Sequence, residues 1–379
     1  IIVCLQRKEL FTMKLVFEKN NLVKAVDIVQ KAVTVRTTMN ILECILIDAE
    51  SNCIKLTGND LDLGIETTLE GEIIEKGSVA IDAKIISDLV KKLPDMPITI
   101  EADDKNIVTV TCEKKNYRLN GLPAEEFSYL TEVEKNVSIT VSQLELKDII
   151  KQTKFSLSPN DNNPIMTGEL FEVKNNNLKV VALDSHRIAI RNLNVDYDGN
   201  IYVIIPGKSL TEIERILEAD NDKKVTIYFS DNHAMFEFNS TRVVSRLIQG
   251  DYFNINKMIS NDYETKLEVN RKDLIDAIDT EMIFIKESDK RPVILNITDN
   301  NILLSVKSTL GEGKEEVEVE KEGKDIKIGF NPKFLLDALK VIDDETVTLT
   351  FVNAMSPCFI RDGEGSYIYL ILPVNFVED

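Results

Sequence analysis

The chain has 379 residues, of which 43% are hydrophobic and 29% are charged, and its formal net charge is −19. This length suits two or three domains, and this composition is that of a soluble globular protein, which excludes a disordered chain. No run approaches the roughly 18–20 apolar residues of a membrane helix, and a protein that binds nucleic acid simply by neutralising phosphates would be basic.

The first twelve residues precede Met13, which opens a natural beginning, MKLVFEKNNL. We therefore treat residues 1–12 as an N-terminal extension without a function. They lack the long apolar region and the cleavage site of a signal peptide, so we expect a cytoplasmic protein. The five cysteines, at positions 4, 44, 53, 112 and 358, are odd in number and lack metal-site spacing. This pattern favours free thiols.

Two kinds of amphipathic helix alternate along the chain. The first kind is predicted within VFEKNNLVKAVDIV from Val16, TVSQLELKDIIKQ from Thr140 and EVNRKDLIDAID from Glu268. The second kind is predicted within DAKIISDLVKKLP from position 82, PGKSLTEIERILE from 206 and NPKFLLDALKVID from 331. Successive copies of the second kind are 124 and 125 residues apart, which is the size of a domain. The pattern predicts three repeated domains, 13–132, 133–260 and 261–379, with six helices.

Short runs of alternating hydrophobicity lie between these helices. Examples are FEVKNNNLKVVALDSHRIAI and LNITDNNILLSVKSTLGE, whose turn residues are KNNN and TDNN. Further strands follow the second helix of a repeat, as in ITIEADDKNIVTVTCEKKNYRL. Helices that cover one face of an antiparallel sheet form an α+β layer architecture. We therefore expect each domain to pack two helices on antiparallel sheet.

Basic residues recur seven positions apart on the second helix of every repeat. The pairs are Lys84 with Lys91, Lys208 with Arg215, and Lys333 with Lys340. Seven residues are close to two helical turns, so each pair shares one face. Solvated faces opposite the core would explain any one pair. Repetition in three domains instead favours one continuous basic surface, while acid gathers in strands and loops, most densely at 311–325.

Catalytic and cofactor motifs are missing from the sequence. There is no GxxxxGK[ST] loop and no GxGxxG turn. His186 follows Ser185 and Asp184, but we place these residues on a strand, where neighbours point to opposite faces and cannot form a triad. Asp60 and Asp62 could share a metal, although an acidic turn before a strand explains them more simply. We expect no catalytic residue, no metal and no cofactor, as in a scaffold or binding protein.

Six ordered motifs resemble those of the bacterial sliding clamps, the beta subunits of DNA polymerase III. They are GLPAEEF (121–127), ALDSHRIAI (182–190), VIIPGKSLTEI (203–213), SRLIQGDYFNINKMI (245–259), FNPKFLLDALKVI (330–342) and SPCFIRDGEGSYIYLILPV (356–374). The resemblance runs from Met13 across the chain. It implies a non-catalytic processivity factor: a head-to-tail dimeric ring whose helices surround duplex DNA. A ring with basic helices inside and acid outside would reconcile the net charge with DNA binding.

The resemblance also implies three sets of site residues. Sequence-independent DNA contacts would fall on Arg36, Lys84, Asn160, Pro164, Ile165, Lys208 and Asn331. The hydrophobic groove for partner peptides would comprise Met166, Leu183, Ser185, His186, Arg187, Ile188, Phe253, Lys257, Met258, Met355, Pro357, Leu370, Ile371, Leu372, Pro373 and Val374. The dimer interface would pair Lys114, Lys115 and Tyr117 with Phe284, Ile285, Glu315, Glu316 and Glu318 of the other copy. The chain departs from some members at Pro164 and Ile165, which replace aromatic residues, and in its tail, NFVED.

The expected partners follow from the resemblance. They are double-stranded DNA, a second copy of the chain, an ATP-driven clamp loader, the replicative DNA polymerase III catalytic subunit, and other polymerases and repair proteins, with no membrane. Two alternatives stay open at this point. One is an enzyme that uses Asp60, Asp62 or the cluster from Asp184 to His186. The other is a monomeric peptide-binding module of 42.9 kDa whose basic faces are only solvated.

Overall fold

The structure is a computed structural model that describes residues 11–34, 37–159, 162–286 and 291–376. The chain divides into two compact units, one formed by residues 1–144 with 215–247 and the other by 145–214 with 248–379. Two of the three boundaries between them fall inside helices, α3 (Gln143–Thr153) and α4 (Gly207–Ile216), and the third lies between residues 247 and 248. No helix in the described part of the chain is long and apolar enough to cross a membrane.

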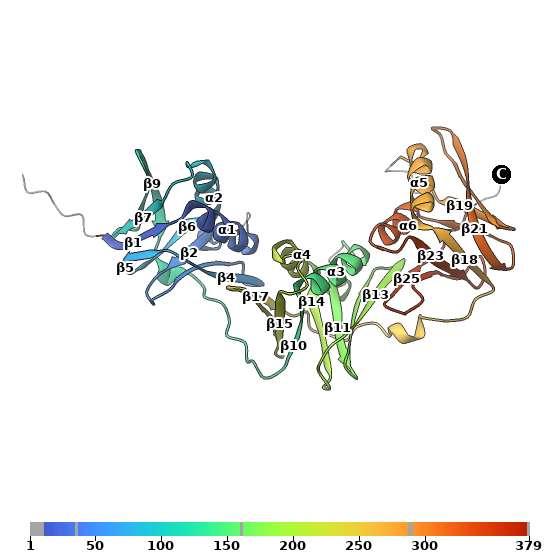
Figure 1. The fold of residues 1–379 in the computed structure, drawn as a ribbon, viewed down its shortest axis with the longest axis horizontal. Coiled ribbons are helices and arrows are strands. Elements are labelled where there is room, and N and C mark those ends of the chain that lie inside the picture. Colours follow the sequence, from blue (N-terminus) through green and yellow to red (C-terminus); the bar gives the residue numbers. More distant parts are fainter. Residues whose placement is uncertain (1–10, 35–36, 160–161, 287–290, 377–379) are drawn as a thin grey trace, which may run out of the picture. The chain divides into compact units, whose positions relative to one another are not determined.

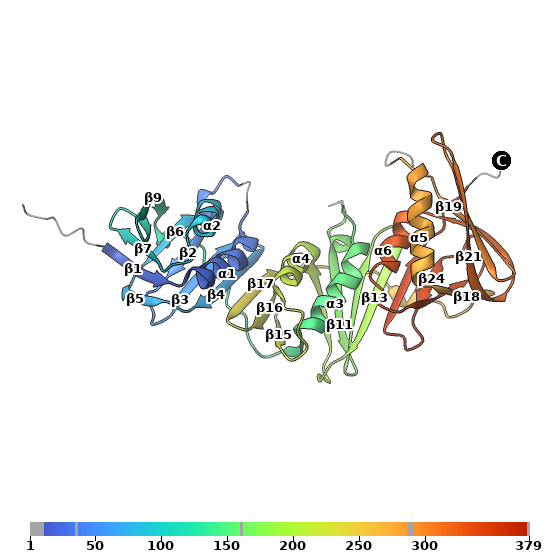
Figure 2. The same ribbon diagram turned by 45° about the horizontal axis from the view of Figure 1, so that its top comes forward.

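The first unit contains one antiparallel sheet with the strand order β10-β15-β16-β17-β4-β3-β2-β6-β9-β8-β7-β1-β5. Its helices α1 (Lys19–Val29) and α2 (Ala83–Lys92) lie side by side in Figures 1 and 2. The strands are β1 (Phe11–Phe17), β2 (Cys44–Asp48), β3 (Ile54–Asn59), β4 (Leu63–Leu69), β5 (Glu72–Glu75), β6 (Ser78–Asp82), β7 (Ile98–Asp103), β8 (Ile107–Cys112), β9 (Lys115–Leu122), β10 (Ser138–Ser142), β15 (Lys224–Phe229), β16 (His233–Phe238) and β17 (Thr241–Arg246). Short 3₁₀ segments are Gln30–Ala32, Asn40–Glu43 and Ala124–Glu126.

The second unit contains a sheet with the order β14-β11-β12-β13-β25-β24-β23-β18-β21-β20-β19-β22. Its helices α5 (Arg271–Glu281) and α6 (Pro332–Leu339) pack against each other. The strands are β11 (Gly168–Lys174), β12 (Asn177–Leu183), β13 (Arg187–Asn194), β14 (Ile201–Pro206), β18 (Thr265–Asn270), β19 (Val293–Thr298), β20 (Asn301–Lys307), β21 (Glu312–Gly323), β22 (Ile326–Phe330), β23 (Thr346–Phe351), β24 (Cys358–Arg361) and β25 (Tyr367–Ile371). Short 3₁₀ segments are Lys154–Ser156, Pro164–Thr167, Ile255–Lys257 and Met282–Phe284.

Each of the six α-helices in the described chain begins within two residues of the end of a strand, as the sequence predicts. Polar residues at this junction start three of them. The side chains of Asp82, Asn270 and Asn331 accept backbone N–H groups in the first turns of α2, α5 and α6, which satisfies donors that have no partner inside the helix. The predicted hairpin at KNNN is also confirmed. Asn175 and Asn176 both have positive φ, 52° and 59°, which the turn between β11 and β12 requires.

The helices bury their apolar faces against the sheets. In the third repeat, Leu274 and Ile278 of α5 and Leu335 and Leu339 of α6 are buried in one cluster with residues of β18 to β25. Burial of such a stripe is what holds an amphipathic helix on a sheet. The opposite faces of the second helices carry the three basic pairs described above. All six of these side chains are exposed. The four described cysteines are free thiols, as expected.

Candidate docking groove and nucleic-acid face

A tight turn between β12 and β13 forms one wall of the candidate groove. The Asp184 carboxylate oxygen Oδ1 accepts the backbone N–H groups of His186 (2.7 Å) and Arg187 (3.0 Å). The expectation that Asp184 to His186 lie on a strand is therefore wrong. An aspartate that accepts hydrogen bonds from the residues two and three positions later favours a turn over continued sheet pairing. The Asp184 carboxylate thus bonds to backbone N–H groups of the turn and to the side chain of Arg187.

Arg187 fixes this turn to α6. Its Nε donates to Asp184 Oδ2 (3.1 Å), and its Nη1 donates to Asp337 Oδ2 (2.6 Å). The guanidinium also lies 4.4 Å from the ring centre of Phe334, within the range of a cation–π contact. Arg187 is only 8% exposed. The Arg187 guanidinium, which was expected to contact partner peptides, is thus bound to carboxylates of the chain itself. Arg187 positions the groove wall.

The groove itself is a cavity of about 440 Å³ in the second unit. Leu183, Ile188 and Leu370 belong to one buried hydrophobic cluster, against which Met166 and Phe253 pack. Flexible methionines beside aliphatic side chains suit a surface that accommodates several different peptides. The residues that line the cavity are Met166, Leu183, Asp184, Ser185, His186, Arg187, Ile188, Phe253, Met258, Pro357, Leu370 and Leu372.

The cavity lacks some of the expected residues and includes one that was not expected. Lys257, Met355, Ile371, Pro373 and Val374 do not line it. Ile371 is 1% exposed and belongs to the core cluster of the third repeat, because neighbours on a strand face opposite sides of the sheet. Asp184 also lines the cavity, although it is not in the expected set. Its signal was the polar pair Asp-Ser between two apolar runs, which is typical of a turn.

The residues considered for catalysis have structural partners. Asp60 Oδ1 accepts the N–H groups of Asp62 (3.1 Å) and Leu63 (2.7 Å), so the acidic turn is the simpler explanation, as expected. Within the described chain, no three His, Cys, Asp or Glu side chains gather as they would around a metal.

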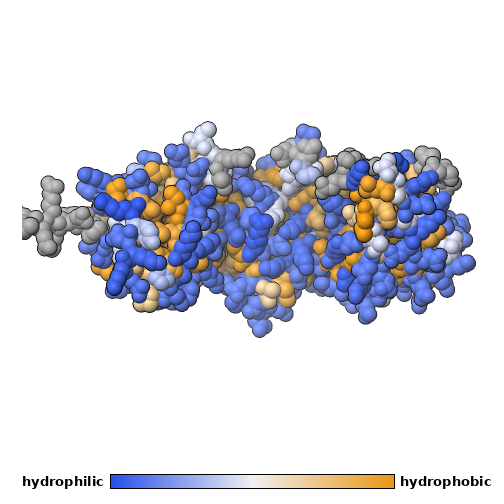
Figure 3. Space-filling view, turned by 90° about the horizontal axis from the view of Figure 1, so that it is seen from above, coloured by the Kyte–Doolittle hydropathy of each residue, from blue (hydrophilic) through white to orange (hydrophobic). Residues whose placement is uncertain are grey.

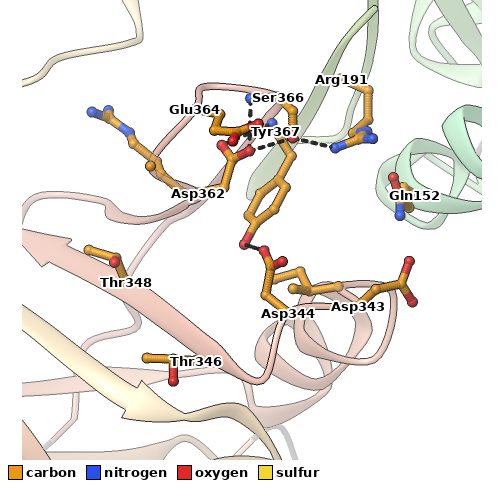
Figure 4. A pocket seen from close by; sticks show the side chains of 13 residues that line it. Gln152, Arg191, Asp343, Asp344, Thr346, Thr348, Asp362, Glu364, Ser366 and Tyr367 are labelled. Carbon is orange, nitrogen blue, oxygen red and sulfur yellow. Dashed lines mark hydrogen bonds between the residues drawn. The ribbon is translucent and has the colours of Figure 1, made fainter.

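A polar cavity of about 510 Å³ lies elsewhere in the second unit (Figure 4). Its side chains bond to one another: the Tyr367 hydroxyl donates to Asp344 Oδ2 (2.9 Å), and Arg191 Nη1 donates to Ser366 Oγ (2.8 Å). Burial, followed by the hydrogen bond to Asp344, raises the pKa of Tyr367. Asp362 Oδ2 accepts the backbone N–H of Ser366 (3.0 Å). These bonds join the turn between β24 and β25 to Arg191 of β13 and to Asp344 before β23.

The basic pairs of the second helices stay at the surface. Lys91 forms an ion pair with Asp27 of α1 (2.6 Å), and Lys340 forms the equivalent pair with Asp279 of α5 (3.1 Å). In Figure 3, hydrophilic residues cover most of the visible surface of each unit. A face of this kind can meet phosphates through mobile lysines without reading sequence.

The remaining DNA candidates have different surroundings. Asn331 already uses its side-chain oxygen to cap α6, where it accepts the Lys333 N–H (3.1 Å). Ile165 packs against the hydrophobic cluster of the groove, whereas the neighbouring Pro164 is exposed. Arg36 and Asn160 lie outside the described residues.

Within the two sheets, β9 and β21 each have a stretch of hydrogen-bonding edge that no other strand in the described chain covers, in addition to the outer edges of the end strands. β9 pairs with β8 from residue 115 to 120 but with β6 only at Gly121 and Leu122. β21 pairs with β20 from residue 312 to 318, and β18 covers its other side only from Val319 onward. Unpaired backbone groups of this kind are templates for pairing with another chain.

The expected interface residues lie at these two edges. Lys114, Lys115 and Tyr117 are exposed at the start of β9, and Glu316 and Glu318 are exposed on β21. Phe284 and Ile285 are half-buried next to Ile283, which is 72% exposed. Glu315 instead faces α5, where burial and the charge of Glu315 raise the pKa of Glu281.

Three consecutive stretches of the chain match three domains of one protein family. Residues 13–131 match the N-terminal domain of the DNA polymerase III beta subunit, residues 140–254 the central domain, and residues 256–375 the C-terminal domain. The chain belongs to the DNA polymerase III beta subunit family. The beta sliding clamp of Bacillus subtilis is a full-length relative, 35% identical over 377 residues that cover 96% of this chain and 100% of that protein.

Solved structures of beta subunits have the same fold. A DNA polymerase III beta subunit from Eubacterium rectale is 53% identical, with a TM-score of 0.93 over 96% of this chain and 99% of that chain. The sliding clamp of Bacillus subtilis is 34% identical, with a TM-score of 0.93 over 97% of this chain and 100% of that chain. The predicted architecture of three α+β clamp domains, each with two helices on antiparallel sheet, is confirmed.

Membership of the beta subunit family decides between the alternatives left open by the sequence. The chain is a sliding clamp, the processivity factor of DNA polymerase III. It is a non-catalytic polymerase subunit, which removes the enzyme alternative. DNA and the polymerase are the partners that the family implies.

Proposed function

We propose that two copies of this chain close head to tail into a ring around duplex DNA, with the basic helix faces turned toward the phosphates. The single observation that carries this proposal is the pair of open strand edges with opposite charge, lysines on β9 and glutamates on β21. Unlike surfaces are what a head-to-tail contact brings together. The domains would span 13–132, 133–260 and 261–379, close to the three stretches that match the family.

The apolar cavity beside the β12–β13 turn supports a second role. We propose that it docks apolar peptide segments of the replicative polymerase subunit, of the clamp loader, and of other polymerases and repair proteins in the cytoplasm. Its lining combines a rigid wall, fixed by Arg187, with the flexible side chains of Met166 and Met258. Burial of an apolar anchor in such a pocket supplies most of the binding energy of a short peptide.

Enclosure of DNA predicts that retention depends on the topology of the DNA. After loading onto nicked circular DNA by a clamp loader with ATP, the protein is expected to stay bound at high salt and to be lost when one cut linearises the circle. The measurement is the amount of protein that elutes with DNA on gel filtration before and after the cut. Equal, salt-sensitive binding to circle and linear DNA would be ordinary electrostatic contact and would end the ring proposal.

Charge reversal on the helix faces tests the orientation of the ring. The triple variant Lys84→Glu, Lys208→Glu and Lys333→Glu is expected to be retained at least about tenfold less, since repulsion would replace three attractive phosphate contacts. The matched control reverses Lys76, Lys105 and Lys174, which are exposed outside these helices, and should be retained like the wild type. Light scattering and a thermal melt would show that both variants stay folded dimers. Equal loss in both would assign the effect to net charge alone.

The open edge of β21 predicts where the ring can be broken. Ile283→Asp places a charge on an apolar side chain that is 72% exposed beside this edge, and is expected to shift the mass in solution from about twice 42.9 kDa to 42.9 kDa. Met355→Asp is the matched control, because Met355 is 86% exposed and lies in the turn between β23 and β24, on neither β9 nor β21. A dimer that survives Ile283→Asp unchanged would place the contact elsewhere.

A further inference from the structure

The turn that builds the groove has a copy at the junction between the first and second repeats. Asp60 lies 124 residues before Asp184. It accepts the N–H groups of Asp62 and Leu63 just as Asp184 accepts those of the residues two and three positions later. Both turns also close with the same backbone bond, from the aspartate N–H to the carbonyl three residues on, at 3.0 Å and 3.1 Å. The two junctions therefore share one local architecture.

The adjoining strand meets both turns in the same way. The Arg246 N–H donates to the Asp62 carbonyl (2.8 Å), and the Leu372 N–H donates to the His186 carbonyl (2.8 Å). Arg246 is the last residue of β17, and Leu372 directly follows β25. These two strands pair with the strands that follow the two turns, β4 and β13. The turn and the adjoining strand of the open groove thus both have counterparts at the first junction.

The cavity at the first junction is nevertheless only about 80 Å³. Leu130 fills this place: it is 8% exposed and packs in one buried cluster with Met235 and Val244. A buried hydrogen bond fixes the approach to it, since Asn59 Nδ2 donates to the Ser128 carbonyl (2.7 Å). The segment from Ser128 to Val133, which we call the strap, therefore lies in its own groove.

A glycine admits the leucine of the strap. A Cβ atom at Gly64 would lie 2.8 Å from Leu130 Cγ, closer than side-chain atoms approach. The position 124 residues later is Ile188, whose side chain lines the open groove. Gly64 and Leu130 thus form a matched pair that closes the first junction.

We propose that the strap is an intramolecular ligand that occupies a second, closed docking groove, and that an extended peptide with a leucine takes its place when the strap leaves. Each chain would then have one open groove for partners and a second groove that its own strap occupies. The closure by the strap is supported by the contacts of Leu130 and Ser128 described above and does not depend on the proposed function. The exchange for a peptide rests on the docking role proposed above for the open groove.

Limited proteolysis tests the closure without any partner. Leu130→Ala removes the anchor and is expected to speed cleavage within residues 128–133 by a protease of broad specificity at least tenfold, while Thr131→Ala, an exposed neighbour, leaves the rate unchanged. Gly64→Ala keeps the leucine but blocks its seat, and should have the same effect as Leu130→Ala. Rapid cleavage of this segment in the folded wild type, or equal cleavage in all three variants that stay folded, would overturn the closure.

A photoreactive copy of the strap tests the exchange. The probe is a synthetic peptide with the sequence FSYLTEVEK, residues 127–135, that carries photoleucine in place of its leucine. In Leu130→Ala it is expected to crosslink to Met235 or Val244, which it does not reach in the wild type. Crosslinks confined to the open groove, or none at the first junction, would overturn the second docking site. Crosslinks at the first junction with none in the open groove would instead count against the proposed function.

Discussion

Replacing Arg187 with alanine is expected to lower the free energy of unfolding by about 3–5 kcal/mol, the usual loss when one partner of a buried ion pair is removed. The variant leaves the carboxylates of Asp184 and Asp337 without their shared guanidinium. It also removes the cation–π contact with Phe334. Urea unfolding followed by circular dichroism measures the change.

Two further variants separate charge from geometry at this site. Arg187→Lys keeps the charge but cannot bridge two carboxylates, so its stability should lie between those of the wild type and the alanine variant. Asp337→Asn tests the contact with α6 alone and should cost less than Arg187→Ala. A loss below about 1 kcal/mol in Arg187→Ala, the range of an exposed pair, would contradict the role of this arginine as the anchor of the groove wall.

Replacing Glu169 with glutamine is expected to stabilise the protein at alkaline pH. Glu169 lies in β11 and is fully buried. Burial raises its pKa to about 8, although the Thr153 hydroxyl and the charge of Lys154 act in the opposite direction. The Thr153 hydroxyl lies 2.7 Å from both the Ile149 carbonyl and Glu169 Oε2. A carbonyl only accepts and a hydroxyl has one proton, so a proton on the carboxyl completes both hydrogen bonds.

The direction of the pH effect follows from the raised pKa. The folded protein keeps the Glu169 proton up to about pH 8, whereas the ordinary value for an unfolded glutamate is 4.5. Stability from this group is therefore fully present below about pH 4.5 and is lost as the pH rises through the interval to about 8. Glutamine has no proton to lose. We expect Glu169→Gln to exceed the wild type by a few kcal/mol at pH 8–9 and to match it near pH 4–5.

The measurement is urea unfolding of both proteins at several pH values from 5 to 9. Glu172→Gln is the matched control, because Glu172 lies on the same strand but is partly exposed and pairs with Lys179. This control should follow the wild-type pH profile. Parallel profiles for Glu169→Gln and the wild type would show that Glu169 does not carry a raised pKa.

The sequence predicts those parts of the fold that local chemistry determines. Helical spacing beside capping residues such as Asp82 and Asn270 marks where helices begin, and Asn175 and Asn176 mark a hairpin. The turn at Asp184 was missed because the apolar runs on both sides also fit one continuous strand. Strand pairing over long separations, such as β13 with β25, has no local signal.

The residues of the candidate site likewise differ in how far the sequence predicts them. Leu183, Ile188 and Leu370 were found because they lie in motifs that resemble the family. Ile371 belongs to the expected set but does not line the cavity, because a motif does not show which face of a strand a residue occupies. The contact of Arg187 with Asp337, 150 residues away, could not be predicted, since it depends on how α6 packs beside the turn. Glu169 likewise reads as an ordinary strand glutamate until its burial is known.

The two open strand edges also restrict how copies of this chain can meet. An edge that begins with Lys114 and Lys115 repels a second copy of itself, and so does an edge that carries Glu316 and Glu318. Symmetric pairing of like edges is therefore disfavoured, while unlike edges attract. Because every copy has one edge of each kind, association has a fixed polarity. In the proposed ring, closure after two copies, and not the edges themselves, would keep this polarity from extending into a filament.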